Sequence, residues 1–141
     1  MTDPGNERAR QIVDEMMRQD GFTKWLAAEI LEVGPGLARI RMTVRPEMCN
    51  GFAVCHGGIT FAFADSAFAF ACNTQGNVAV SIENSITYPA AARAGDVLVA
   101  VAREATRSNR ILYYHVDVTK LDGTVVGLFR GTAYRTEKPH P

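Results

Sequence analysis

The 141-residue sequence has no excess of charge of either sign, because its 15 lysines and arginines equal its 15 aspartates and glutamates. Proteins that bind nucleic acid or anionic membranes usually carry a basic excess, so neither partner is expected. No basic segment followed by an apolar run stands after Met1, and a secretory signal is therefore not predicted. The length suits a single domain over residues 1–141.

Paired cysteines are also lacking. The three present, Cys49, Cys55 and Cys72, are odd in number and have no paired spacing, which argues against a disulfide framework. Free thiols fit a reducing compartment, so the cytoplasm is the predicted location. Cys49, Cys55 and His56 lack the second ligand pair of a tetrahedral site, and we predict neither a metal nor another cofactor.

No uncharged run is long enough to cross a membrane. Asp65 is the only charge between Gly57 and Cys72, but these 16 residues are fewer than the roughly 20 that a span requires. A carboxylate at the centre of such a span would also be costly in lipid. We therefore interpret this segment as a helix buried in protein.

Periodicity and turn residues predict one long apolar helix among six strands. The expected elements are a helix over 7–20 in an N-terminal segment 1–21, strands over 25–33 and 37–44, the central helix over 57–73, strands over 78–88, 96–106, 110–120 and 124–135, and a frayed tail over 136–141. The connections are too short for parallel crossovers, so the strands should be antiparallel. One helix and one long sheet bury each other only if the sheet wraps around the helix, which predicts an α+β fold.

Asp65 shares one stripe of the central helix with small residues. At about 100° per residue, its neighbours on that stripe are Gly58, Ala62, Ala69 and Cys72. A core-facing stripe would normally carry larger side chains. The stripe therefore either allows close approach of another element, such as a second subunit, or leaves room for a substrate, and both can hold together.

A buried carboxylate needs hydrogen-bond partners or a function. Asp65 could be structural, bonded to a nearby backbone or hydroxyl group, and Ser66 is a candidate partner. Perturbed carboxylates cluster at active sites, which favours a catalytic role.

The start of the same helix could bind a carbonyl oxygen. Gly57 and Gly58 follow His56, and helix N-termini present unpaired N–H groups that glycine leaves accessible. The alternative is simple loop flexibility. Gly57 and Asp65 are eight residues apart, about 12 Å along one helix, so one carbonyl group cannot touch both within a chain. If both act on the same group, they come from two antiparallel helices of a symmetric dimer.

Residues 50–58 (NGFAVCHGG) and 61–73 (FAFADSAFAFACN), with Phe129-Arg130-Gly131, resemble hotdog-fold acyl-CoA thioesterases of the phenylacetate-degradation (PaaI) type. The resemblance implies a hotdog fold, a curved antiparallel sheet around one central helix, that assembles into dimers and often tetramers. It implies an acyl-CoA substrate, in which coenzyme A is part of the substrate rather than a cofactor.

The resemblance also implies residue roles. Asp65 matches the catalytic carboxylate, as general base toward water or as nucleophile, and Gly57 matches the N–H that polarises the thioester carbonyl. Asn50 and His56 match residues beside the reacting group. Ser81 matches a position where some relatives carry a hydroxyl that orients water, and we add Gly58, Ser66, Arg93 and Arg130 as candidate substrate-binding residues. Relatives often carry an Arg-Pro pair before the Gly-Asp turn, which this chain lacks, so Arg107 and Arg110 are further candidates for the coenzyme A phosphates.

Other interpretations remain open from the sequence. Asn50-Gly51 is by default a turn, and His56 could serve only to cap the helix. Cys55 with His115 could form a nucleophile–base pair. The chain could instead be a hotdog enoyl-CoA hydratase or dehydratase, or a non-catalytic acyl-CoA-binding module.

Overall fold

The computed structural model describes residues 3–141, so Met1 and Thr2 of the predicted segment 1–21 lie outside the described residues. The elements in chain order are α1 (Pro4–Gln19), α2 (Gly21–Trp25), β1 (Glu29–Gly34), β2 (Leu37–Thr43), the 3-10 turn η1 (Pro46–Met48), α3 (Gly57–Cys72), β3 (Asn77–Thr87), β4 (Val97–Arg107), β5 (Ile111–Lys120) and β6 (Val125–Pro139). The central helix and all six strands are therefore confirmed, with boundaries that shift by up to four residues.

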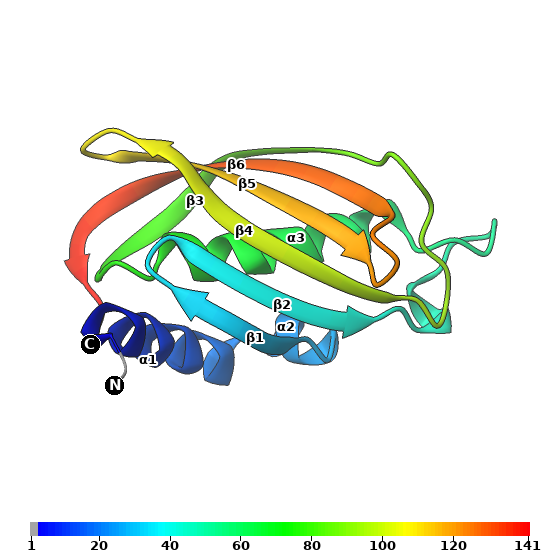
Figure 1. Ribbon diagram of the computed structural model, residues 1–141, viewed down its shortest axis with the longest axis horizontal. Coiled ribbons are helices and arrows are strands. Elements are labelled where there is room, and N and C mark those ends of the chain that lie inside the picture. Colours follow the sequence, from blue (N-terminus) through cyan, green and yellow to red (C-terminus); the bar gives the residue numbers. More distant parts are fainter. Residues whose placement is uncertain (1–2) are drawn as a thin grey trace.

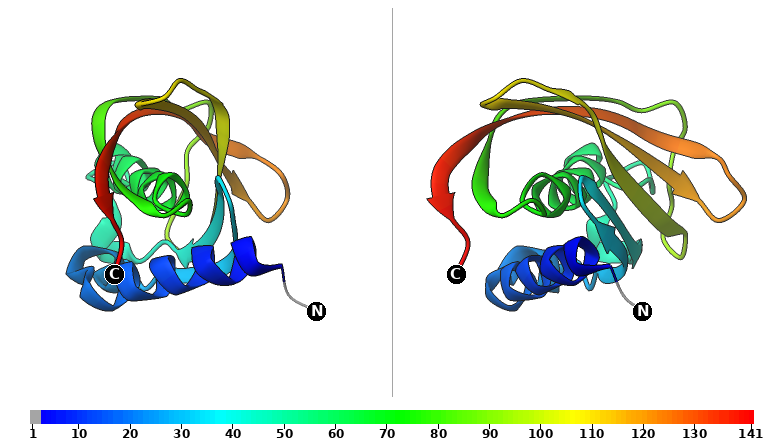
Figure 2. Two further views of the ribbon diagram at one scale, coloured as in Figure 1. Left: turned by 90° about the vertical axis from the view of Figure 1, so that its left-hand side faces the viewer. Right: turned by 60° about the vertical axis from the view of Figure 1, so that its left-hand side comes forward.

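The six strands form one antiparallel sheet in the order β1-β2-β4-β5-β6-β3. The sheet curls around α3, and α1 and α2 lie across the open side of the curl (Figures 1 and 2). This is the α+β hotdog architecture that the sequence predicted. The short strand β1 and the 11-residue strand β3 are the two edges of the sheet. Among residues 3–141, no helix is long and apolar enough to cross a membrane.

The core lies between α3 and the concave face of the sheet. Phe63, Phe68 and Phe70 of the helix are fully buried there. β5 meets them with alternate residues, as its pattern predicted: Leu112, Tyr114, Val116 and Val118 are buried. β6 comes so close that a side chain at Gly131 would place its Cβ 2.7 Å from the Phe68 ring. Glycine is therefore required where this strand crosses the helix.

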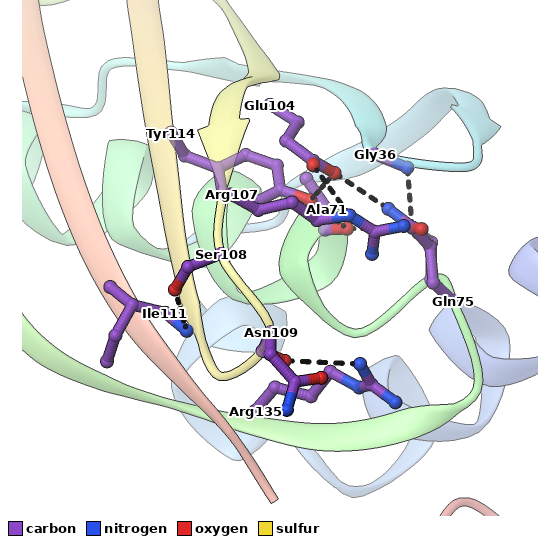
Figure 3. A network of polar contacts seen from close by, with 11 residues as sticks. Gly36, Ala71, Gln75, Glu104, Arg107, Ser108, Asn109, Ile111, Tyr114 and Arg135 are labelled. Atoms are coloured by element: carbon purple, nitrogen blue, oxygen red, sulfur yellow. Dashed lines mark hydrogen bonds and ion pairs between the residues drawn. The ribbon is translucent and has the colours of Figure 1, made fainter.

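The C-terminal end of α3 is tied to the sheet by a polar network (Figure 3). The Tyr114 hydroxyl contacts the carbonyl oxygen of Ala71 at 3.2 Å and the Glu104 carboxylate at 3.3 Å. Gln75 donates to the same carboxylate at 2.8 Å. Burial and the Glu104 charge raise the pKa of Tyr114, so its hydroxyl stays protonated as a donor. The network fixes the position of α3 along its axis, and with it the position of the residues on its open side.

The predicted strand over 25–33 was wrong in its first part. Asp20 ends α1, but its side chain then accepts a hydrogen bond from the Thr23 N–H at 2.9 Å and begins α2. Gly21 is therefore the first residue of a short helix rather than a helix terminator. Ala27, at a positive φ of 56°, turns the chain into β1. Similarly, Asp3 caps α1 and lets it begin at Pro4, earlier than expected.

The predicted frayed tail over 136–141 was also wrong. β6 continues to Pro139, which pairs with Asn77. The Thr136 hydroxyl donates to the Val78 carbonyl at 2.6 Å, and the His140 N–H donates to the Gly76 carbonyl at 2.8 Å. Polar composition suggested a loose end, but pairing with the long edge strand satisfies these backbone groups.

Candidate active site

One side of α3 is left open by the fold. Gly58 is exposed in the first turn, and beyond that turn every residue of the helix is buried except Phe61, Ala62, Asp65 and Ala69. The predicted stripe of small residues around Asp65 is therefore the uncovered side of the helix. Cys72 is the exception, because the end of the stripe is buried under the sheet. The result is a shallow apolar strip with one carboxylate in its middle.

Asp65 is half-buried, and its surroundings disfavour the charged form. Burial raises the pKa of its carboxyl group, and the negative charge of Asp20, at the junction of α1 and α2, raises it further. One hydrogen bond opposes this: the Asn84 side-chain amide, from β3, donates to Asp65 Oδ1 at 3.3 Å. Asp65 is thus a carboxylate poised to accept a proton, since a raised pKa makes it a stronger base.

Asn84 was not found from the sequence. It links Asp65 to Ser81, whose hydroxyl lies 3.0 Å from Asn84 Oδ1. Ser81 and Asn84 are three residues apart on one strand, and simple alternation would place them on opposite faces. A β-bulge between Ser81 and Glu83 changes the alternation, and nothing in the local sequence announces it.

His56 caps the N-terminus of α3. Its Nδ1 accepts a hydrogen bond from the Gly58 N–H at 3.1 Å, and its carbonyl accepts from the N–H groups of Ile59 and Thr60. In the neutral ring the proton is then on Nε2. The Gly57 N–H has no acceptor within residues 3–141 and remains available at the positive end of the helix. The first turn thus presents a single free donor, the one that the sequence singled out.

A cavity of about 440 Å³ opens beside this donor. Asn50, Gly57 and Tyr88 line it, together with the segment 89–92. Asn50 Oδ1 accepts from the N–H groups of Phe52 and Val54, so the Asn50–Gly51 turn is real and the amide nitrogen stays free to contact a ligand. The Tyr88 hydroxyl donates to the Gly57 carbonyl at 2.8 Å. Tyr88 was missed by the sequence analysis, because its position 31 residues from Gly57 gives no local signal.

Asp65 does not line this cavity. It lies two helical turns further along α3, about 12 Å from Gly57. Within one chain the structure therefore brings Asn50, His56 and Gly57 together at the helix start, and Asp65 with Ser81 at mid-helix. The two halves do not meet within one chain.

Three predicted binding residues lie elsewhere. Ser66 is buried, and its hydroxyl lies 2.8 Å from that of Thr23, so it joins α2 to α3 instead of facing the open stripe. Arg130 lies on the outer face of β6, between Ser85 and His115 of the neighbouring strands. Arg93 is exposed in the β3–β4 loop. The assignment of Ser66 to substrate binding is corrected by its burial, and neither arginine is grouped with Asp65.

A cysteine nucleophile has no support in the geometry. Cys55 is buried, and burial raises the pKa of its thiol. His115 is exposed, opposite Arg130 on the outer face of the sheet, and so cannot act as its base. Within the described part of the chain there is no group of three His, Cys, Asp or Glu side chains that could hold a metal ion.

Comparison with known proteins places this geometry in context. The thioesterase superfamily model matches residues 52–127, which include α3. A putative esterase of Archaeoglobus fulgidus is 39% identical over 136 residues, covering 96% of this chain and 88% of that protein. Acyl-coenzyme A thioesterase PaaI of Escherichia coli is 35% identical over 130 residues, covering 92% and 93%. The solved structure of the E. coli PaaI protein from the phenylacetic acid degradation operon superimposes with a TM-score of 0.93 at 34% identity, covering 95% of this chain and 97% of that one.

Proposed function

The chain belongs to the thioesterase superfamily, and on this basis we propose that it is an enzyme that hydrolyses an acyl-CoA thioester to a free acid and coenzyme A. The observation that carries the proposal is that one helix bears both a half-buried carboxylate, Asp65, and a free N-terminal donor, the Gly57 N–H. A carboxylate base and an oxyanion donor are the two groups that such a hydrolysis requires.

In the proposed reaction, Asp65 accepts a proton from a water molecule as that water attacks the thioester carbonyl carbon. The carbonyl oxygen gains negative charge and is stabilised by the Gly57 N–H at the positive end of α3. When the tetrahedral intermediate collapses, the carbon–sulfur bond breaks and the thiolate of coenzyme A leaves, taking up the proton that Asp65 received and restoring the carboxylate. The Asn50 amide and His56 Nε2 lie beside the carbonyl site, where they orient the thioester, and Ser81 lies on the Asp65 side, where its hydroxyl contacts the water.

The proposed site is formed by two chains. Asp65 of one protomer and Gly57 of another serve the same carbonyl, which resolves their separation of about 12 Å along one helix. The open stripe of α3 supports this arrangement, because its small residues permit close approach of a second helix. So does the free edge of β3, which exposes Val80 and Ile82. We extend the proposal to a homotetramer built from two such dimers. The exposed side chains of Tyr113 on β5 and Leu128 on β6 support a second contact surface.

For the acyl group we propose an aryl-acetyl chain. The support is the solved E. coli relative, whose source is the phenylacetic acid degradation operon. Arg93 and Arg130 are the proposed contacts for the coenzyme A phosphates, as exposed arginines able to form bidentate pairs with phosphate. The three free cysteines support a cytoplasmic location.

The test is a panel of acyl-CoA substrates, including phenylacetyl-CoA and fatty acyl-CoA esters, with release of the free thiol as readout. Thioester hydrolysis that Asp65→Asn nearly abolishes, without loss of the fold by circular dichroism, is the expected result. Retention of the full rate in Asp65→Asn would overturn the proposal. Enoyl-CoA hydration is measured in parallel, and hydration without thiol release would identify a hydratase instead.

A further inference from the structure

The side chain of Asn84 lies between Ser81 and Asp65 and contacts both. Its amide nitrogen is 3.3 Å from Asp65 Oδ1, and its amide oxygen is 3.0 Å from the Ser81 hydroxyl. A carboxylate only accepts hydrogen bonds, so the nitrogen must face Asp65. The amide oxygen then faces Ser81, and the hydroxyl proton points toward it. Both neighbours therefore specify the same orientation of the Asn84 amide.

The bulge in β3 is what gathers these groups. Ser81 pairs with Ala133 and Asn84 with Gly131, and both partners lie on the face of β6 that packs on α3. Before the bulge Ala79 and Ser81 share the inward face, and after it Asn84 does. In a regular strand residues 81 and 84 would point in opposite directions. The extra residue thus serves to bring a second polar side chain to the carboxylate.

The two oxygens of Asp65 are not equivalent. Oδ1 accepts from Asn84, and no other hydrogen bond to the Asp65 carboxylate occurs among residues 3–141. The side chain lies on the open stripe of α3 and is only partly buried, and its second oxygen has no hydrogen-bond partner among residues 3–141. A base that is held by one oxygen presents the other in a fixed direction.

We propose that Asn84 is a positioning residue, which holds one carboxylate oxygen of Asp65 and, being oriented in turn by Ser81, directs the other oxygen at the water. The inference rests on the proposed role of Asp65 as the base. Asn84 contacts neither the thioester nor the water, and it acts through Asp65.

Few titratable groups surround Asp65. Asp20 approaches from the junction of α1 and α2, and the Cys72 thiol lies further along α3. Glu83 of β3 pairs with Thr132 on the outer face, and Glu104 of β4 bonds Tyr114 of β5 at the far end of the helix. The buried residues of β2 and β6 are uncharged. Among residues 3–141, the hydrogen bond from Asn84 is therefore the one polar contact of the carboxylate that favours the ionised form of Asp65.

The test replaces Asn84 by leucine, which keeps its shape but cannot donate. In Asn84→Leu, kcat should fall about ten- to a hundredfold with little change in KM, because a hydrogen bond to a charged group is lost. The acid limb of the pH–rate profile should move to higher pH by about one unit. The control is Asn77→Leu in the same strand, which loses a hydrogen bond to the Thr136 carbonyl away from the carboxylate and should change neither value.

Two further variants keep the test decisive. Asn84→Asp retains the shape and places a second carboxylate beside Asp65, so the acid limb should move up further. Ser81→Ala should cause a smaller loss than Asn84→Leu, and the loss in the double variant should be smaller than the product of the two single losses, because the two side chains share one hydrogen-bond network. Losses that multiply independently would contradict the inference.

A carboxyl 13C NMR titration of Asp65 provides a readout that needs no turnover. Its midpoint should rise in Asn84→Leu and not in Asn77→Leu. An unchanged midpoint in a folded Asn84→Leu would overturn the inference while leaving thioester hydrolysis intact. If the wild-type protein hydrolyses no thioester, the proposed function fails, and the NMR titration still decides whether Asn84 controls the ionisation of Asp65.

Discussion

The Tyr88 hydroxyl donates a hydrogen bond to the carbonyl oxygen of Gly57, the residue that begins α3. The aromatic ring also packs against Gly57, where a Cβ would lie 3.2 Å from the Tyr88 ring. Tyr88 thus fixes the first helical residue from the side of the cavity, opposite to the cap formed by His56.

Removing only this hydroxyl should loosen the proposed oxyanion donor. In Tyr88→Phe we expect kcat to fall about two- to tenfold, the usual effect of one neutral hydrogen bond. The melting temperature should hardly change, because Tyr88 is largely exposed. Tyr113→Phe, another exposed tyrosine, is the matched control and should have the wild-type rate. A wild-type rate in Tyr88→Phe would show that the cap alone holds Gly57.

The Gly57 N–H can be deleted without breaking the helix. Proline is favoured at the first helical position, and His56 already has the extended backbone, with a ψ of 133°, that precedes proline. Gly57→Pro should lower kcat about a hundredfold or more, as expected for loss of an oxyanion donor. Gly57→Ala crowds Tyr88 in the same way but keeps the N–H, so the difference between the two variants isolates the donor.

Mixing inactive variants should restore activity if two chains share each site. A heterodimer of Asp65→Asn and Gly57→Pro contains one site with both groups intact. Random exchange of equal amounts should recover about a quarter of the wild-type activity, measured as thiol release. No recovery, with exchange verified by native mass spectrometry, would place both groups in one chain.

The pH dependence of hydrolysis should reflect the raised pKa of Asp65. The base acts when ionised, so the rate should fall as the pH drops through this pKa, at a higher pH than an ordinary aspartate of about 3.9 would give. Asp20→Asn keeps the oxygen that caps α2 but removes a negative charge. Its acid limb should therefore lie at lower pH than that of the wild type, and a limb that does not move would exclude Asp20 as a cause.

The same shift makes Asp65 a cost to stability at neutral pH. Its pKa is higher in the folded than in the unfolded chain, so its contribution is most favourable below the unfolded pKa and is lost as the pH rises through the folded value. Asp65→Asn should then melt at a higher temperature than the wild type at pH 7, and the difference should shrink toward pH 3. A lower melting temperature at pH 7 would mean that the carboxylate is structural.

Gly131 provides a test of the packing that supports the site. Gly131→Ala would push its Cβ to 2.7 Å from the Phe68 ring and should lower the free energy of unfolding by about 1–3 kcal/mol in urea denaturation. Gly21→Ala, where no atom lies within 4 Å of the added Cβ, should change it by less than about 0.5 kcal/mol. Equal effects would mean that β6 can move away from α3.

The sequence predicted those features that depend on one periodic element. The helical period placed Asp65 among small residues, and the structure confirms that Ala62 and Ala69 share its open side. Strand alternation predicted which side of β5 is buried. The short helix α2 was missed because its start depends on a single capping contact from Asp20 rather than on a periodic pattern.

Contacts between distant segments could not be predicted in this way. Tyr88 reaches Gly57 only because the chain turns back after β3, and Thr23 reaches Ser66 only because α2 folds onto α3. Asn84 was missed for a different reason: regular alternation from Ser81 would place its side chain on the outer face, and the bulge turns it inward.

The bulge at residue 82 adds one residue to β3 that has no partner in β6. The side chains after it therefore lie on the face opposite to the one expected from regular alternation, while the pairing with β6 continues to Thr87. If the same sequence paired with β6 without the bulge, Glu83 would lie opposite Gly131 and Asn84 would turn to the outer face, away from the carboxylate. The position of a bulge in one edge strand is therefore a means, independent of substitution, by which this fold can exchange the groups around its central helix.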